Sequence, residues 1–477
     1  MLPFLLNRAF VLTTLLCLGF ILTIYFVQYN QNPLPFFSSV FFTEQHTESE
    51  WSELYAQIEL LQPYEEKTYT KCPYQPSNSI YKYSLRYWKA INDTEIRQAK
   101  FNWQSFVRTI PNYPHGNYSG YGIVSSTSTN ENFQRTLAQI KLLRWLNCQL
   151  PIEIYSFEGE LNETEVITLH TVPDVQVKFI NDIVDEENRN VPRYAIKPNA
   201  ILQSRFKHVL WLDCDNIPVK DPTYLFHTEH YKQSTAMFWP DFWISSSSNP
   251  VWRIFDLECR QEDYEQESGQ ILINKETAWK PLNLAVYLNK DPFIQNILRG
   301  DKETFRLAWK VLKVPFYFIR KFLAVGGFDY VKVDKNGNRN LSKTDFCGHT
   351  TIQHDPKGDI IFLHLNAIKY NSYIKYPVEL KHIPLIGKQN PWKTYRRYSN
   401  THAYFRPQII DTNNSDWCTY LPMGEHDHYP PVFETDFHTL VAANITAKYI
   451  DYGGLLLKTR RRKTKETRIE VVDRIWN

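Results

Sequence analysis

Apolar residues are spread unevenly along the chain, and the densest run lies near its amino terminus. From Ala9 to Val27 no charged residue interrupts a sequence of mainly Leu, Val, Phe, Ile and Thr, which is long enough to span a bilayer. Arg8 precedes the run and no small-residue cleavage site follows it, so an uncleaved anchor is favoured over a cleaved signal peptide. The positive-inside tendency predicts a single-pass type II topology: residues 1–8 form a cytoplasmic tail, residues 9–27 span the membrane, and the rest is luminal.

Downstream of the predicted anchor, the hydrophobic pattern changes. Residues 28–50 are rich in Pro, Asn, Phe and Ser without clean periodicity, so we expect a stem that holds the following domain away from the membrane. A globular domain is predicted over residues 51–477. Its composition agrees, because 43% hydrophobic and 22% charged residues are ordinary for a folded protein, and a net charge of +3 is too small for a nucleic-acid-binding surface.

Within this domain, short apolar runs alternate with segments of helical periodicity from Gly120 onward. The segment Glu131–Asn147 places apolar residues three and four positions apart, as an amphipathic helix does. Strands are predicted at residues 120–125, 152–155, 175–180 and 208–212, and a second helix at residues 195–203. Repeated β-α-β units of this kind predict an α/β sheet with helices on both faces, in which ligands bind beyond the carboxyl ends of the strands.

Two carboxylates directly follow the last of these strands. Asp213 and Asp215 are one residue apart, so both side chains can turn toward a pocket at the strand end. Carboxylate oxygens are hard ligands that suit Mn²⁺ or Mg²⁺, and such an ion would bridge the diphosphate of a sugar nucleotide. Because Asp is also common in turns, the motif gains its weight from the buried strand before it and from the luminal placement.

Other features agree with a luminal domain that handles sugars. Aromatic residues make up 15% of the chain, and their faces stack well on sugar rings, although such rings also fill cores. The cysteines are sparse and show no Cys-x-x-Cys spacing. Glycosylation sequons of the form Asn-x-Ser/Thr are spread along the chain, beginning at Asn92, Asn117, Asn162, Asn340, Asn413 and Asn444.

Several motifs occur in a characteristic order, and together they resemble a known family. They are residues 210–222 around the two carboxylates, Leu225-Phe226, residues 238–243, residues 267–270, residues 300–305 and residues 353–355. This set resembles the fungal α-mannosyltransferases that branch and cap mannan outer chains, over about Tyr121 to Lys369. The resemblance implies a GT-A fold with a Rossmann-like, nucleotide-sugar-binding sheet at about residues 118–375. It also implies GDP-mannose as donor, Mn²⁺ dependence, residence in the Golgi membrane, and retention of the α configuration.

The resemblance also implies a set of metal and phosphate ligands. It makes Asp213 and Asp215 the site for the metal and the nucleotide diphosphate. Retaining transferases of the glycogenin type supply a third metal ligand from a histidine, and His364 is similar, with a purely structural histidine as the alternative. Lys369 would balance phosphate charge, or would be a surface lysine. The segment lacks the Gly and Pro-Trp usually found after that histidine, and Lys369 is displaced by one position.

Three further residues are predicted to line the donor. Gly122 and Ile123 resemble the first strand of the donor site, where small residues let the nucleotide approach the backbone. Lys197 precedes the acidic motif by about one helix and would reach the phosphates, unless it faces solvent.

Three carboxylates are candidates for a nucleophile or a stabiliser of the oxocarbenium-like centre, namely Asp301, Glu267 and Asp241. Acceptor binding is the alternative for each. Asp241 could accept hydrogen bonds from sugar hydroxyls while neighbouring rings stack beneath the sugar, and a structural ion pair is the competing account. The rings in question are those of Trp239, Phe242 and Trp243.

Together these observations predict a retaining α-mannosyltransferase that extends glycoprotein mannan or N-glycan acceptors. An α-1,2 linkage is expected, because residues 238–243 resemble the α-1,2 branch of the family. An α-1,3 linkage is the alternative. Membership of a Golgi mannosyltransferase complex is also expected. A non-catalytic, lectin-like or scaffold subunit is one rival. The intact pair Asp213 and Asp215 argues against it, because a binding module needs no metal bound to a diphosphate. A glycosidase is another, but no pair of carboxylates flanking a bond is identifiable. The region after about residue 380 receives no role.

Overall fold

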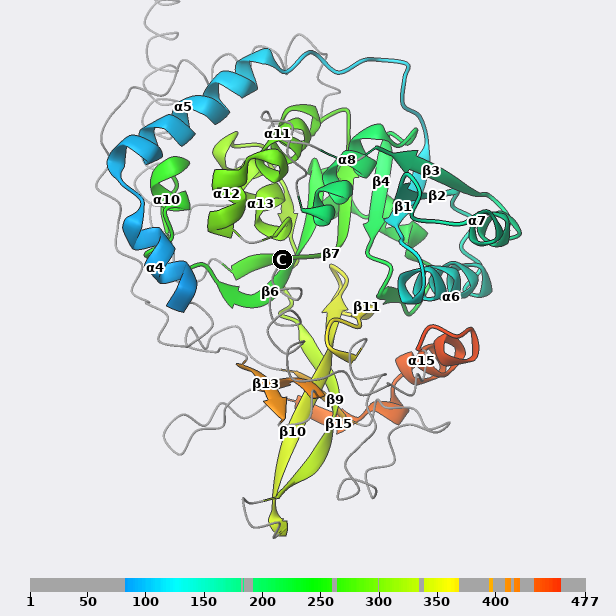
Figure 1. Cartoon of the computed structure of the whole chain (residues 1–477). Coiled ribbons are helices and arrows are strands. Elements are labelled where there is room, and N and C mark those ends of the chain that lie inside the picture. Colours follow the sequence, from blue (N-terminus) through cyan, green and yellow to red (C-terminus); the bar gives the residue numbers. More distant parts are fainter. Residues whose placement is uncertain are drawn as a thin grey trace, which may run out of the picture. The chain divides into compact units, whose positions relative to one another are not determined.

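A computed structural model describes residues 82–181, 183, 192–259, 264–298, 300–333, 339–368, 394–397, 408–412, 416–420 and 433–455 (Figure 1). These ranges lie within one compact unit that runs from Glu65 to Asn477. The predicted tail, anchor and stem, the predicted domain start at residue 51, and Lys369 lie outside the described residues. None of the helices in the described ranges has both the length and the apolar character that crossing a bilayer requires.

A seven-stranded sheet carries the first part of the chain. Its strands are β1 (Tyr121–Ser126), β2 (Ile152–Phe157), β3 (Val175–Ile180), β4 (His208–Leu212), β6 (Ala236–Ile244), β7 (Tyr264–Asn274) and β8 (Tyr317–Phe318), in the order β3-β2-β1-β4-β7-β6-β8. The strands β1 to β4 are parallel, which confirms the four predicted strands, whereas β7 runs antiparallel to both β4 and β6. The carboxyl ends of β4 and β6 therefore lie at the same edge.

Helices cover both faces of this sheet, as predicted. α6 (Glu131–Trp145) and α7 (Glu163–His170) pack in the cluster that contains Leu210 and Leu212. Trp211 points the opposite way, because side chains alternate along a strand, and it meets Lys197 of α8 (Ile196–Gln203). α11 (Trp279–Lys290) contacts both α8 and α13 (Lys302–Val311) (Figure 1). The remaining helices of this part are α4 (Lys82–Ala90), α5 (Asp93–Thr109), α9 (Glu229–Lys232), α10 (Val251–Ile254) and α12 (Pro292–Leu298), with 3-10 turns η2 (Arg193–Ala195) and η3 (Pro222–His227).

A second, antiparallel sheet is formed mainly by later residues, and the sequence patterns predicted none of it. Its path is β13-β14-β10-β9-β12-β15, and β11 pairs with both β10 and β5. The strands are β5 (Asn216–Pro218), β9 (Ala324–Val333), β10 (Arg339–His354), β11 (Ile360–His364), β12 (Thr394–Arg397), β13 (Gln408–Thr412), β14 (Asp416–Tyr420) and β15 (Phe433–Asp436). Because β5 follows the acidic turn after β4, the second sheet begins at the carboxyl edge of the first.

Candidate metal and donor site

The turn after β4 carries both predicted acidic ligands. The Asp213 N–H donates to the carbonyl of Gly269 in β7 at 2.8 Å, and the Asn216 N–H donates to the Asp213 carbonyl at 2.9 Å. From α6, the Gln139 side-chain amide donates to the carbonyls of Asp213 at 2.7 Å and of Asn216 at 2.5 Å. The backbone of the turn is thus tied both to the neighbouring strand and to a helix, which limits the directions open to its carboxylates.

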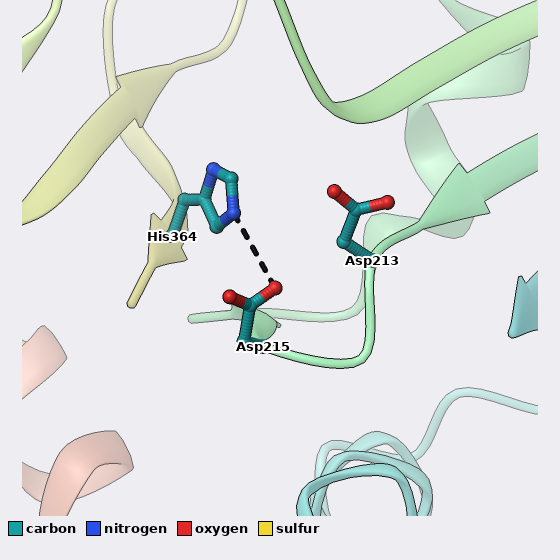
Figure 2. A group of neighbouring side chains, drawn as sticks. All are labelled: Asp213, Asp215 and His364. Carbon is teal, nitrogen blue, oxygen red and sulfur yellow. Dashed lines mark ion pairs between the residues drawn. The ribbon is translucent and has the colours of Figure 1, made fainter. Parts of the chain in front are cut away.

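His364 reaches this turn from the second sheet. It lies opposite Asn216 in the β5–β11 ladder, and the Leu365 N–H donates to the Asp215 carbonyl at 2.9 Å. One ligand atom from each of Asp213, Asp215 and His364 lies within 4.8 Å of the others (Figure 2). The structure therefore brings together the three side chains that were predicted to bind a metal.

A carboxylate orients the imidazole of His364. Its Nδ1 lies 2.8 Å from Oε1 of Glu267, which also accepts the Gly269 N–H at 2.7 Å. Because an ionised carboxylate only accepts hydrogen bonds, Nδ1 carries a hydrogen. Nε2 then faces Oδ1 of Asp215 at 3.3 Å, and two lone pairs at that distance repel unless a proton or a cation lies between them. Two carboxylates and an imidazole so arranged fit a divalent ion such as Mn²⁺.

Opposite charges stabilise the pair of His364 and Glu267. Burial alone would lower the pKa of His364, but Glu267 and Asp215 raise that pKa well above its usual range. Burial would raise the pKa of Glu267, but His364 lowers it below its ordinary value. Glu267, predicted as a candidate nucleophile, therefore lies in the structure as a negatively charged partner that fixes the imidazole ring.

Lys197 joins two carboxylates at the same edge. It is 5% exposed, and its Nζ lies 3.1 Å from Asp213 Oδ1 and 2.8 Å from Asp301 Oδ2. It also donates to the carbonyl and the hydroxyl of Ser268, at 2.8 and 2.9 Å. Burial would lower the pKa of Lys197, but Asp213 and Asp301 hold it above its usual range. An ammonium has three hydrogens, and all of them have protein acceptors here. Lys197 therefore neither faces solvent nor has a hydrogen left for a phosphate, the two alternatives considered from the sequence.

A second lysine makes a comparable bridge one strand farther along. Lys302 Nζ lies 2.7 Å from Asp241 Oδ2 and 2.7 Å from Glu265 Oε2. Asp241 thus forms the ion pair that was the alternative to binding a sugar hydroxyl. Asp241 lies on β6, and β7 separates this strand from β4 and from the acidic turn that follows β4.

The prediction that aromatic rings near Asp241 stack beneath a sugar is wrong for two of the three rings. Trp239 is 0% exposed and donates from its indole to the His354 carbonyl, and Phe242 is 3% exposed. Both rings belong to the core, because a sugar could reach their faces only by displacing packed side chains. The side chain of Trp243 lies outside the described residues.

The two predicted residues of the first strand also lie inside the core. Ile123 is fully buried in the cluster beneath α6. A Cβ atom on Gly122 would overlap the ring of Phe206, so packing of that ring requires the glycine. The prediction of a close nucleotide approach at Gly122 is therefore corrected: a phenylalanine ring already occupies the space beside it.

Gln139 is the residue of this site that sequence reasoning missed. It is 1% exposed, and it lies between Ala138 and Ile140 in the apolar part of α6. A buried amide needs hydrogen-bond partners, so a polar residue at this position signalled some buried contact. Nothing local in the sequence indicates that its partners are two carbonyls of the acidic turn.

The net charge at this edge favours a cation. Four carboxylates surround two cationic side chains, and they are Asp213, Asp215, Glu267 and Asp301 around Lys197 and His364. Oε2 of Glu267 is also buried without a hydrogen-bond partner among the described residues. An acidic site beyond the carboxyl ends of parallel strands lies where α/β proteins of the doubly wound type generally bind their ligands.

Comparison with known proteins identifies the family. The family model described as "Mannosyltransferase putative" matches residues 120–265 and 253–355. The chain is 28% identical to alpha-1,2-mannosyltransferase MNN21 of Candida albicans, over 60% of this chain and 50% of the relative. It is 26% identical to alpha-1,2-mannosyltransferase MNN2 of Saccharomyces cerevisiae, over 54% of this chain and 58% of the relative. The chain spans about half the length of these curated relatives, and it belongs to this family of fungal mannosyltransferases.

Solved structures show only a distant likeness. The galactosyltransferase LgtC in complex with donor and acceptor sugar analogues is 10% identical, with a TM-score of 0.30 over 42% of this chain and 73% of that chain. The glycosyltransferase GlyE of Streptococcus pneumoniae is 13% identical, with a TM-score of 0.29 over 43% of this chain and 46% of that chain. At such scores no residue of this chain can be assigned from its counterpart.

Proposed function

We propose that the chain is a metal-dependent mannosyltransferase that moves mannose from GDP-mannose to an α-mannoside terminus with retention of the α configuration. The observation that carries this proposal is the convergence of Asp213, Asp215 and His364 at the carboxyl edge of the sheet, in a chain of the mannosyltransferase family. A fold of the GT-A type is part of the proposal, supported by the parallel strands that end at this site.

The metal would be held by Asp213, Asp215 and Nε2 of His364, and Mn²⁺ or Mg²⁺ suits these ligands. When bound, a divalent ion there supplies charge that balances the departing nucleoside diphosphate. Glu267 holds the ring of His364 so that Nε2 faces the two aspartates. Such outer partners of a metal-binding histidine fix its tautomer and its orientation.

The remaining polar residues of the edge position the reacting sugar. Lys197 keeps Asp301 beside Asp213, and Lys302 keeps Asp241 beside Glu265. Of Asp301 and Asp241, Asp301 is the one linked to the metal triad, because the ammonium of Lys197 joins it to Asp213. We therefore propose Asp301, ahead of Asp241, as the group that stabilises the developing oxocarbenium-like centre. Glu267 is engaged with His364 and serves as its positioning partner.

We further propose α-1,2 linkage, acting on glycoprotein mannan or N-glycans. The named relatives in Candida albicans and Saccharomyces cerevisiae are both α-1,2-mannosyltransferases, which supports this choice over α-1,3 linkage. The apolar run from Ala9 to Val27 supports a Golgi membrane protein of type II topology with a luminal catalytic domain, acting alone or in a mannosyltransferase complex.

The deciding experiment measures mannose transfer by the purified full-length chain in detergent, from GDP-mannose to an α-mannoside acceptor. Transfer that requires Mn²⁺, stops with EDTA and is lost in Asp215→Ala is the expected result, and NMR of the product reads the linkage. A folded protein that binds α-mannosides but transfers nothing from any nucleotide sugar would overturn the enzyme proposal in favour of a lectin or scaffold.

A further inference from the structure

Helix α15 (Ala442–Asp451) lies beyond the residues that match the family model, yet it packs against α6 (Figure 1). α6 is the helix whose Gln139 holds the acidic turn by two hydrogen bonds. A late segment of the chain, for which the sequence offered no role, therefore contacts the support of the metal site.

The hydrophobic cluster that includes α15 also contains both strands that set the positions of the metal ligands. Ile217 of β5 follows Asp215 by two positions, and Leu363 and Leu365 flank His364 at the end of β11. The same cluster contains Ala138 and Leu142 from α6 and Ala442, Ala443, Ile445 and Tyr449 from α15. α15 and the β5–β11 ladder thus share one hydrophobic cluster, in which α6 contacts both α15 and β5.

This ladder decides the geometry of the candidate metal site. It places His364 opposite Asn216, so that Nε2 of His364 lies 3.3 Å from Asp215 Oδ1. Metal–ligand distances tolerate deviations of only about 0.2 Å. If α15 no longer filled its side of the cluster, the two strands could relax toward the space left, and the separation of the two ligands would change.

Tyr449 is the largest side chain that α15 places in this cluster. It is fully buried, and a Cβ atom on Gly454 would overlap its ring. Burial raises the pKa of Tyr449 well above its usual range, Arg135 lowers it, and Cys214 and Asp215 raise it further, so the phenol lies within electrostatic reach of the acidic turn. The Tyr449 hydroxyl has no hydrogen-bond partner among the described residues, so Tyr449 contributes to this cluster through the packing of its ring.

We propose that α15 is a positioning element of the Asp213, Asp215 and His364 site, and that it acts through the ring of Tyr449. This inference rests on the proposed metal site. It extends the catalytic unit from the family-matched region to the segment 442–454, because that segment packs on α6 and shares a cluster with the strands that carry the metal ligands.

The test compares Mn²⁺ affinity among variants of the full-length chain, measured from the electron paramagnetic resonance signal of free Mn²⁺ under conditions where each variant is folded. Tyr449→Ala should weaken binding about tenfold or more, the size typical for loss of a residue that orients metal ligands. Tyr449→Phe keeps the ring and should stay within about twofold of the wild type. Tyr231→Ala is the matched control: Tyr231 is buried near the amino end of β4, where it bonds to His208, and its loss should lower stability without changing affinity.

Equal Mn²⁺ affinity of Tyr449→Ala and wild type would overturn the inference, and so would equal losses in Tyr449→Phe and Tyr449→Ala. If Tyr449→Ala does not fold, Ile445→Val deletes one methylene of the same cluster and must still weaken Mn²⁺ binding more than Tyr231→Phe does. Asp215→Ala separates the two proposals: if it binds Mn²⁺ like the wild type, the metal site itself is wrong, whereas its loss of binding beside a normal Tyr449→Ala rejects only the role of α15.

Discussion

Two lysines at one edge of the sheet each bridge two carboxylates, but only one of the lysines is buried. Lys197 joins Asp213 to Asp301, and Lys302 joins Asp241 to Glu265. Asp301 and Lys302 are adjacent in sequence at the start of α13, yet they turn to different bridges. Only the first bridge shares a carboxylate with the metal triad. The side chain of Lys197 is also more deeply buried, at 6% exposed against 30% for Lys302.

Ion pairs with similar distances can therefore have different roles in one protein. Removing one partner of a buried pair leaves an unpaired charge, and the penalty grows as water is excluded. In addition, the first bridge constrains Asp213, a ligand of the proposed metal. The second bridge constrains Glu265 on β7 and Asp241 on β6, which lie one and two strands away from β4. The first bridge should therefore matter for both stability and metal binding, and the second mainly for stability and substrate positioning.

The largest expected effect comes from breaking the two bridges separately. Lys197→Met should lower the free energy of unfolding by about 3–5 kcal/mol, because Asp213 and Asp301 remain buried without their cation. Lys302→Met should cost less, about 1 kcal/mol, since water reaches its partly exposed side chain. Urea denaturation followed by circular dichroism measures both, and equal losses would contradict the distinction.

Metal binding sharpens the same comparison. At a free Mn²⁺ concentration about 100 times the dissociation constant, the free energy of unfolding of the wild type should rise by about 2.7 kcal/mol. Asp215→Ala should abolish this rise, whereas Asp241→Asn should keep it. Thermal unfolding with and without Mn²⁺ provides the measurement. Loss of the rise in Asp241→Asn would place the second bridge inside the metal site.

A smaller effect is expected from the partner of the histidine. Glu267→Gln should weaken Mn²⁺ binding about tenfold, which corresponds to about 1.4 kcal/mol, because the amide no longer fixes the His364 tautomer as the carboxylate does. Isothermal titration with Mn²⁺ gives the affinity. If Glu267→Gln instead keeps the metal affinity but loses turnover, Glu267 acts on the sugar and the positioning role is rejected.

The smallest effect comes from the opposite end of β4, where no metal is involved. Burial lowers the pKa of His208 to about 4. The folded state therefore binds fewer protons than the unfolded state between about pH 6.5 and pH 4, so the contribution of His208 is complete above pH 6.5 and is lost as the pH falls. Between pH 7 and pH 5 we expect a loss of about 1 kcal/mol, reduced by partial solvent screening. His208→Gln should flatten this part of a curve of melting temperature against pH; an unchanged slope would show that other groups produce it.

Much of the first sheet could be predicted because its signals are local. The apolar run 208–212 and the amphipathic segment from Glu131 are recognisable within a few residues, and parallel strands place their carboxyl ends at one edge by topology. The acidic pair Asp213 and Asp215 was found for the same reason. The second sheet was not predicted. Its link to the acidic turn is the β5–β11 pair, which joins Pro218 to Phe362 across a long stretch of sequence, and β5 has only three residues.

The errors have a common cause as well. Gly122, Trp239 and Phe242 were expected to face a ligand, but the structure buries each of them against another ring or within the core. A small residue or an aromatic residue has the same appearance in a sequence whether it meets a ligand or a packed side chain. Only the neighbours supplied by distant segments separate the two cases, as Phe206 does for Gly122.

The sequence by itself determined the α/β class, the place of the acidic turn and the kind of ion that its carboxylates suit. The tertiary structure decided which residues meet there. His364 reaches Asp215 through the β5–β11 ladder, Glu267 turns the imidazole, and Gln139 ties the turn to α6. Strand and helix propensities act over neighbouring residues and can be read locally, whereas a coordination geometry depends on side chains that only the packed core brings within a few ångströms.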